Sequence, residues 1–533
     1  SEKEIFTYMR EKTFKIDPLY TDREAWKIME FRYEMMINPA TIEKPLLIAE
    51  DISTETMIEL EERSAEFMGI STYPKPYRYY EDAAVVGHIV GYMRNIGNYY
   101  AEWSEKYPEL GYQITDMVGW DGIELAEEQS LRGINGKTRK EVDTEGRLRA
   151  YEVEVSPRPG QDIYLTIDLN LQQAAYDSLE RNIQLIRERE HKKNRHDANA
   201  GAVVAMDVKN GEILAMVSYP TYDPNVFISG DWEKINALNN DPNRSTWNRA
   251  TRGNYAPGST YKPLIAIAGL ETGTITPNTK LYCPYKMEIG GLMWTNPEGD
   301  QKFINLERAL ATSSNMFFFQ TGFNTGIDNI VYWAKNFGFG RHTGIEIGDS
   351  IGALASREFK QRELGEGWVP ADTVNASIGQ LYNAFTPIQL VSYVSTIGNG
   401  GKMYRPHLIR KKVDSTGKVT MTEIEYQETG AKKSTIEAVQ KGMVAVTNSE
   451  DGTAVDAFKD FPFDVAGKTG TAETGHEETE SSNALFVCYA PADDPQIAVA
   501  VVVEKGVIGA WTAPIARDVL MTYFNIREQK DSQ

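Results

Sequence analysis

The sequence predicts a two-part chain whose larger part is an α/β fold built on one sheet of five strands. Two apolar strand candidates come early, at Ala202–Val208 and Glu212–Val217, and the favoured hairpin turn Asn210-Gly211 joins them. Three more strand candidates come late, and a mainly helical stretch separates the two groups. The late candidates are Phe463–Thr474, Ala484–Ala490 and Ile497–Glu504. We therefore expect the early and late strands to pair across the insert.

The N-terminal residues 1–157 predict a smaller α+β region. They are polar and have mixed periodicity, and they contain no concentration of catalytic residue types. Turn residues cluster at Ser156-Pro-Arg-Pro-Gly160, so we place a domain boundary there and predict domains 1–157 and 158–533. The elements expected before the boundary are a helix at Thr54–Phe67, a strand or short buried segment at Val85–Tyr92, a helix at Gly122–Arg132 and strands within Lys137–Val155.

The second part opens with a short strand, a long helix and a charged connection. Its middle contains a long polar loop, then a buried helix that begins near Ser259, then an apolar helical region that Ser313-Ser-Asn315 interrupts. The expected ranges are Ile163–Ile167, Leu169–Glu190 and 187–197 for the opening, 230–257 for the loop, Leu306–Thr321 for the interrupted region and Ala513–Phe524 for a closing helix.

Composition excludes several classes of protein. The chain has 533 residues and a formal net charge of −20, which argues against nucleic acid as a partner. Only Cys283 and Cys488 are present, so the fold is not built on disulfides. No apolar run approaches the ~20 residues that a membrane-spanning helix needs. The chain begins at Ser1 without Met, and we expect that a segment preceding it has been removed.

The stretch Tyr255-Ala-Pro-Gly-Ser-Thr-Tyr-Lys262 carries the first chemical signal. It turns through Pro257-Gly258 and enters an apolar helix, so Ser259 and Lys262 lie three residues apart on one helix face. A serine hydroxyl becomes nucleophilic when a neighbouring base takes its proton, and a buried lysine with a lowered pKa can do so. Alone the pattern is weak, since Ser415-Thr-Gly-Lys418 matches it in what reads as a hairpin turn.

Two later motifs give this serine a context. Ser313-Ser-Asn315 follows in the helical region, and Lys468-Thr-Gly-Thr471 lies on a strand candidate. Each motif has a structural alternative: a loop or helix cap for the first, and a strand with a bulge at Gly470 for the second. A second Ser-x-Asn at Ser481-Ser-Asn483 lies in a polar turn after the lysine motif. In this order and on these elements, the three motifs are typical of active-site serine acyl transferases.

Along nearly all its length the chain resembles a class B penicillin-binding protein. Besides the three motifs, the resemblance rests on stretches in both parts of the chain: His88-Ile-Val-Gly-Tyr92, Gly122-Ile-Glu-Leu125, Leu131-Arg-Gly133, Gly160–Gln172, Gly201–Asp207, Gly211–Pro220, Asn248–Gly253, Ser377–Gln380 and Thr386–Leu390. It implies an α+β pedestal of the dimerisation type followed by a transpeptidase domain with a five-stranded antiparallel sheet between helical layers. No glycosyltransferase domain is visible, which argues against the bifunctional class A relatives.

The resemblance implies D,D-transpeptidation of peptidoglycan through a serine acyl-enzyme, which β-lactams block. Ser259 would be the nucleophile, Lys262 its base and Ser313 the proton relay, while Asn315 binds the substrate backbone and Lys468 supplies positive charge. Thr469, Gly470 and Thr471 would form the substrate-binding strand, where the two hydroxyls hold the terminal carboxylate and the amides of Ser259 and Thr471 form the oxyanion hole.

One group of residues stands outside the family pattern. Glu473 and His476 follow the lysine motif, and Cys488 replaces a glycine usual in relatives on the next strand. If the two strands form a hairpin, carboxylate, imidazole and thiolate converge beside the active site, a ligand set that suits Zn²⁺. The alternative is an exposed Glu and His in an acidic turn and a buried structural Cys. The serine chemistry itself requires no cofactor.

Two other functions stay open at this point. A β-lactamase or β-lactam sensor shares the first and last motifs, although the large N-terminal region argues against both. A catalytically silent cell-wall scaffold need not keep all the motif residues. The resemblance further implies stem peptides and β-lactams as ligands, a SEDS-type glycosyltransferase as partner, and a place at the extracytoplasmic face of a bacterial membrane through a single N-terminal anchor missing from this chain. His88-Ile-Val-Gly-Tyr92 favours the elongation-type subgroup.

Overall fold

The computed structural model describes residues 2–37, 39, 46–64, 66–67, 69–72, 77–142, 148–476 and 478–526. The chain divides into two compact units, Ser1–Tyr77 and Arg78–Gln533. The boundary predicted after residue 157 lies inside the second unit and stays a prediction about sequence domains. None of the helices in the described ranges is both long and apolar enough to cross a membrane.

The first unit is a small helical body. Its core is made by Phe14, Ile16, Ala25 and Met29, which are buried together. The predicted helix that begins at Thr54 is present, capped by the Ser53 hydroxyl, but it ends earlier than expected. The elements of this unit are α1 (Glu2–Tyr8), the π-helical turn Met9–Thr13, α2 (Asp22–Ile37) and α3 (Thr54–Glu62).

The second unit begins with a series of short helices and strands. The segment Val85–Tyr92, predicted as a strand or short buried segment, is mostly helical, and Nε2 of the buried His88 lies 2.8 Å from the carbonyl oxygen of Ser245. The helix predicted at Gly122–Arg132 is present as two short helices. These elements are α4 (Ala83–Val90), β1 (Met93–Asn95), α5 (Tyr100–Lys106), β2 (Met117–Gly119), α6 (Gly122–Ala126), α7 (Glu128–Leu131), β3 (Lys137–Val142) and β4 (Leu148–Val155).

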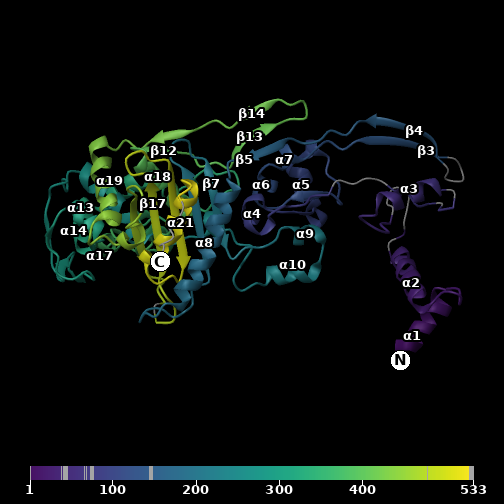
Figure 1. The fold of residues 1–533 in the computed structure, drawn as a ribbon, viewed down its shortest axis with the longest axis horizontal. Helices are drawn as coiled ribbons and strands as arrows, with labels where there is room; N and C mark the ends of the chain where they lie inside the picture. The colour runs from purple at the N-terminus through teal and green to yellow at the C-terminus, as the bar shows by residue number, and fades with distance from the viewer. Residues whose placement is uncertain are drawn as a thin grey trace, which may run out of the picture. The chain divides into compact units, whose positions relative to one another are not determined.

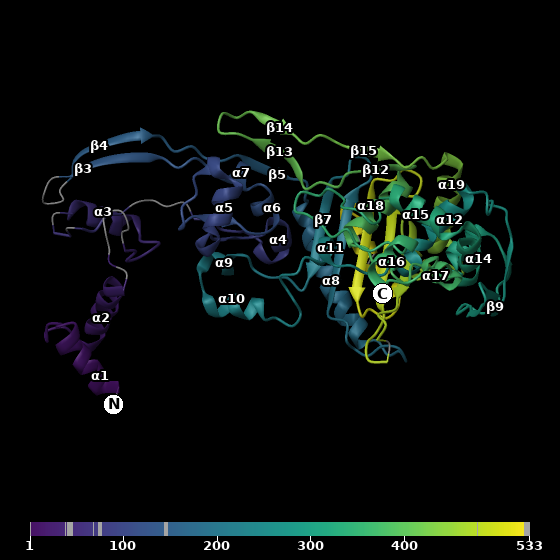
Figure 2. The same ribbon diagram turned by 180° about the vertical axis from the view of Figure 1, so that it is seen from behind.

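The predicted five-stranded antiparallel sheet is confirmed. Its spatial order is β16-β17-β18-β6-β7, so the two early strands join the three late ones through the pairing of β18 with β6. Figures 1 and 2 show its late strands as yellow arrows from opposite sides. Strand β18 is fully buried over nearly all its length, as its apolar sequence requires. The strands are β6 (Ala200–Asp207), β7 (Ile213–Tyr219), β16 (Ala466–Ala472), β17 (Asn483–Ala490) and β18 (Ile497–Glu504).

Helices cover both faces of this sheet, as the resemblance implied. Helices α8 (Leu169–Glu188) and α21 (Ala513–Tyr523) pack on one face. On the other face lie α18 (Pro387–Gly398) and α19 (Lys433–Asn448), and α12 (Lys262–Glu271) packs against α19 (Figure 2). Because side chains alternate along a strand, β17 sends Leu485 and Val487 to the second face and Phe486 and Cys488 to the first.

Shorter elements complete the second unit. The prediction of a loop at 230–257 is wrong in part. Its polar residues form two short helices, and the side chains of Asp231 and Asn248 cap their first turns. The strands are β5 (Asp162–Leu165), β8 (Leu281–Cys283), β9 (Lys286–Ile289), β10 (Leu292–Thr295), β11 (Lys302–Ile304), β12 (Lys402–Tyr404), β13 (Ile409–Val413), β14 (Val419–Met421) and β15 (Tyr426–Glu428). The helices are α9 (Asn225–Ser229), α10 (Trp232–Asn239), α11 (Arg249–Arg252), α13 (Leu306–Ala311), α14 (Asn315–Thr325), α15 (Ile327–Asn336), α16 (Arg357–Leu364), α17 (Pro370–Ala376) and α20 (Val455–Phe458).

Candidate active site

Ser259 lies at the start of a buried helix. The 3₁₀ turn Gly258–Tyr261 leads directly into α12, and Pro263 occupies the first turn, where its missing N–H is tolerated. The Ser259 side chain is partly exposed, while α12 itself is almost entirely buried. Within the described residues the Ser259 hydroxyl has no hydrogen-bond partner, so it is free to meet a ligand.

Two fully buried lysines converge on one hydroxyl. Nζ of Lys262 lies 3.2 Å from Oγ of Ser313, and Nζ of Lys468 lies 2.8 Å from the same oxygen. Both lysine side chains have an exposed fraction of 0%. Lys262 also donates to Oδ1 of Asn315 at 2.6 Å and to the Ser313 carbonyl oxygen. The structure thus brings Lys262, Ser313, Asn315 and Lys468 into one hydrogen-bonded group.

This environment lowers the pKa of both lysines. Burial lowers the pKa of Lys262 to about 8, and the negative charge of Glu298 opposes that shift. Burial also holds the pKa of Lys468 well below its ordinary value, and the positive charge of Lys262 adds to the effect. Because two ammonium groups on one hydroxyl repel each other, the pair favours a single shared positive charge. One amine is then available as a base near neutral pH.

Ser313 is held in an unusual backbone conformation. Its φ is +60°, in the left-handed region that non-glycine residues rarely adopt. It lies between α13 and α14, and the next helix begins at Asn315 with Ser314 as its N-cap. This conformation directs the Ser313 hydroxyl and carbonyl and the Asn315 amide toward the lysines, so the break in the helical region forms the site.

The lysine motif lies on β16, beside the serine turn. A Cβ atom on Gly258 would lie 2.5 Å from the carbonyl oxygen of Thr471 and 3.4 Å from its nitrogen. Gly470 is similarly close to the backbone of Pro257. The Thr469 hydroxyl lies 2.8 Å from that of Thr453, and the Thr471 hydroxyl accepts a hydrogen bond from Gly509 N at 3.1 Å. The backbone of Ser259 and the end of β16 therefore border the same space.

The three predicted zinc ligands are not brought together. In the β16–β17 hairpin Cys488 pairs with Gly467, whereas Glu473 follows the last pair of the hairpin, Ala472 with Asn483. Glu473 is six residues beyond Gly467, so at about 3.3 Å per residue it lies about 20 Å from the level of Cys488 along the strands. Cys488 is buried in the core on the sheet face that α8 and α21 cover, and burial raises the pKa of its thiol. Glu473 and His476 are exposed. No metal-binding cluster of three such side chains exists among the described residues, so this set does not fit Zn²⁺. The expected convergence of Glu473, His476 and Cys488 is not observed, because the register of β16 and β17 separates Cys488 from Glu473. The sequence does not specify this register.

Sequence reasoning missed two residues at the site. Glu298, in the turn before β11, accepts a hydrogen bond from Asn315 N at 3.4 Å and acts electrostatically on both lysines. Thr453 reaches the Thr469 hydroxyl from the segment after α19. Neither residue belongs to a motif, and only the tertiary fold brings them to the site.

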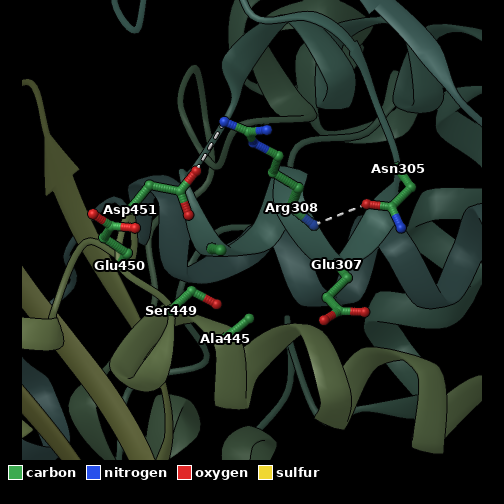
Figure 3. Close-up of a pocket in the computed structure, with 8 residues that line it drawn as sticks. Asn305, Glu307, Arg308, Ala445, Ser449, Glu450 and Asp451 are labelled. Atoms are coloured by element: carbon green, nitrogen blue, oxygen red, sulfur yellow. Dashed lines mark hydrogen bonds and ion pairs between the residues drawn. The ribbon is translucent and has the colours of Figure 1, made fainter.

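A separate cavity of about 640 Å³ lies between the start of α13 and the end of α19 (Figure 3). Arg308 and Asp451 bridge it with an ion pair of 3.1 Å, and Asn305 caps the helix below Arg308. None of the predicted site residues is among the described residues that line this cavity. It is therefore distinct from the serine site.

Comparison with known proteins places this geometry in context. The family described as "Penicillin binding protein transpeptidase domain" matches residues 201–521, and the "Penicillin-binding Protein dimerisation domain" matches residues 2–165. The peptidoglycan D,D-transpeptidase MrdA of Escherichia coli K12 is 33% identical over 480 residues, which cover 85% of this chain and 72% of that protein.

Solved structures agree with this similarity. One is described as Pseudomonas aeruginosa PBP2 in complex with WCK 5153, with a TM-score of 0.69 and 31% identity over 86% of this chain and 94% of that one. Another, from work on the coordination of polymerization and crosslinking by a peptidoglycan synthase complex, has a TM-score of 0.79 and 29% identity. It covers 94% of this chain and 86% of that one.

Proposed function

Because this chain belongs to the class B penicillin-binding proteins and is a peptidoglycan D,D-transpeptidase, we propose that Ser259 is the residue that its stem-peptide substrate acylates. The observation that carries the proposal is the convergence of two buried lysines on Ser313 beside a serine with a free hydroxyl. Ser259 attacks the carbonyl carbon of the penultimate D-Ala, and the terminal D-Ala leaves.

Lys262 takes the proton of Ser259 in this step. Its pKa of about 8 leaves a substantial neutral fraction near neutral pH, which an exposed lysine lacks. Lys468 donates to the Ser313 hydroxyl at 2.8 Å and holds it beside Lys262. Ser313 then passes the proton from Lys262 to the leaving amine, since its hydroxyl contacts both lysines.

The substrate lies along β16. The amides of Ser259 and Thr471 donate to the oxyanion of the tetrahedral intermediate, and the close approach of Gly258 to Thr471 supports this arrangement. Thr469 and Thr471 hold the terminal carboxylate by their hydroxyls, and Gly470 keeps the strand close to Pro257. Asn315 binds the substrate backbone through its side-chain amide while its Oδ1 stays on Lys262.

The acyl-enzyme is resolved by an amine of a second stem peptide, which gives a cross-link and frees Ser259. β-Lactams mimic the D-Ala-D-Ala terminus and leave a stable ester on the same oxygen. The N-terminal match to a dimerisation domain favours a wall-synthesis enzyme over a β-lactamase or sensor. The hydrogen-bonded set of Lys262, Ser313, Asn315 and Lys468 favours an enzyme over a catalytically silent scaffold.

We further infer an elongation-type role and a membrane-associated assembly. The MrdA relative supports the subgroup, and the similar structure from a peptidoglycan synthase complex supports a polymerising glycosyltransferase of the SEDS type as partner. In this proposal the chain works at the extracytoplasmic face of the bacterial membrane.

Cross-linking of un-cross-linked peptidoglycan strands tests the proposal. The protein should form dimers of stem peptides and release D-Ala, and Ser259→Ala should abolish both products. A variant with the exposed Ser415 changed to Ala should behave like the parent, because that decoy lies in the turn between β13 and β14. Strands left un-cross-linked under conditions in which β-lactam is hydrolysed would favour the β-lactamase alternative.

A further inference from the structure

Glu298 is an acidic side chain beside the catalytic lysines to which the mechanism above gives no role. It lies in the turn between β10 and β11, and its Oε2 accepts from the backbone N–H of Asn315 at 3.4 Å. Asn315 in turn receives Nζ of Lys262 on Oδ1 at 2.6 Å. The carboxylate is therefore separated from the proposed base by a single residue, and it remains exposed to solvent.

The turn that carries Glu298 is fixed to both sides of the Ser313 motif. Asn296, which is fully buried, donates to Gly299 O at 2.7 Å and accepts from Met316 N at 3.4 Å. Gln301 donates to the Thr312 hydroxyl at 2.9 Å. These contacts attach the turn to the residues on both sides of Ser313. The fold therefore fixes the negatively charged Glu298 beside Asn315.

Deacylation creates a need for such a charge. The acceptor amine is an ammonium ion in water near neutral pH, since an unperturbed lysine ammonium has a pKa of about 10.4. It must approach an ester that lies beside the positive charge shared by Lys262 and Lys468. Like charges repel, so an ammonium enters this site only where a carboxylate offsets the repulsion. Glu298 is the carboxylate that acts on both lysines.

We propose that Glu298 forms the subsite for the ammonium group of the acceptor stem peptide, next to Asn315. The proposal rests on the transpeptidase function proposed above. The acceptor ammonium pairs with Glu298, loses one proton to solvent and attacks the ester carbon as a neutral amine. The new C–N bond forms, the C–O bond to Ser259 breaks, and the second amine proton passes through Lys262 and Ser313 to the Ser259 oxygen. One ester and one ammonium thus give one amide, one hydroxyl and one released proton.

A nucleophile competition tests this subsite. The acyl-enzyme is generated from a thioester donor ending in D-Ala at about pH 7.5, where Lys262 still carries most of its positive charge, and is offered Nα-acetyl-L-lysine amide or hydroxylamine. The first carries an ammonium at this pH and the second is neutral. We expect Glu298→Gln, which keeps an oxygen for Asn315 N–H, to lower the ratio of lysine product to hydroxamate about fivefold.

Glu288→Gln is the matched control, because Glu288 is an exposed carboxylate on β9 in the same part of the fold. It should leave the ratio unchanged. In the parent protein, added salt should lower the lysine product and spare the hydroxamate, since an exposed ion pair is screened. An unchanged ratio in Glu298→Gln, or an equal loss of both products, would overturn the subsite and leave only helix capping as the role of Glu298. A complete lack of acyl-enzyme would instead contradict the proposed function itself.

Discussion

A single serine hydroxyl organises the chemistry at the residue scale. Ser313 receives two buried lysines, and its positive φ of +60° places its backbone carbonyl on Lys262 as well. Strained conformations of this kind persist only where the surroundings determine them, and here the two helices α13 and α14 do so. The result is a base whose protonation responds to its neighbours rather than to solvent.

The pH dependence of acylation follows from that arrangement. Lys262 acts as a base only when neutral, so the rate constant for acylation by benzylpenicillin should rise with pH and have its midpoint near 8. Glu298 raises the pKa of Lys262 against the effect of burial. Glu298→Gln should therefore move the midpoint to lower pH, and Glu288→Gln should not. Stopped-flow acylation from about pH 6 to about pH 10 checks this, and an upward shift would contradict the assigned base.

The motif residues could be predicted from the sequence because their order and spacing are recognisable without coordinates. Ser259 and Lys262 lie on one helix turn, and Lys468 lies on a strand, as expected. The predicted convergence of Glu473, His476 and Cys488 required a different kind of information, and the structure does not show it. Whether Cys488 lies near Glu473 depends on strand register and on which sheet face it joins. Glu298 was missed because a lone Glu in a Gly-containing turn carries no signal.

At the scale of elements, the site depends on how closely the serine turn approaches β16. Gly258 has a φ of +51°, and a Cβ atom there would overlap the Thr471 carbonyl oxygen. Gly509 closes the other side of the same strand, where a Cβ atom would lie 2.3 Å from Gly470 O. Two glycines thus allow the backbones on either side of β16 to pack against it.

Gly258→Ala should separate the two halves of the proposed oxyanion hole. The added methyl group forces the turn away from Thr471, so we expect acylation by benzylpenicillin to slow about 100-fold or more. Gly417→Ala is the control, since Gly417 also has a positive φ, of +85°, but nothing within 4 Å of its Cβ position. It should melt at a lower temperature and acylate normally. Equal acylation by both variants would show that the contact with Thr471 is unimportant.

The main elements were predictable where periodicity or composition is strong. The hairpin at Asn210-Gly211, the late strands and α8 are present near their predicted bounds. Val85–Tyr92 was ambiguous because a short apolar run rich in β-branched residues suits a strand and a buried helix equally. The short helices in 230–257 depend on single capping side chains, which a polar loop could equally contain.

At the scale of the whole molecule, α4 and α6 are part of the main body of the second unit, although they precede the predicted boundary at 157. Ile89 and Ile123 belong to its main core. Gln172 donates to Val85 O at 2.8 Å, and Arg252, just before the serine turn, pairs with Asp121 at 2.6 Å. These contacts join the N-terminal elements to α8 and α11.

Two truncated chains test this division. A chain of residues 78–533 should keep its melting temperature and its reaction with benzylpenicillin, because 1–77 form a unit of their own. A chain of residues 158–533 loses the packing of Ile89 and Ile123 and the contacts of Gln172 and Arg252, about 5 kcal/mol in all, and should melt about 6 °C lower. Calorimetry decides the point, and equal melting of both chains would contradict the packing described.

Intact mass after incubation with benzylpenicillin tests most directly whether Ser259 is an acylable nucleophile within a slow-deacylating site. We expect a persistent mass increase equal to the whole drug in the parent chain and none in Ser259→Ala. An adduct that survives Ser259→Ala, or hydrolysis of the drug without any adduct, would contradict this role of Ser259.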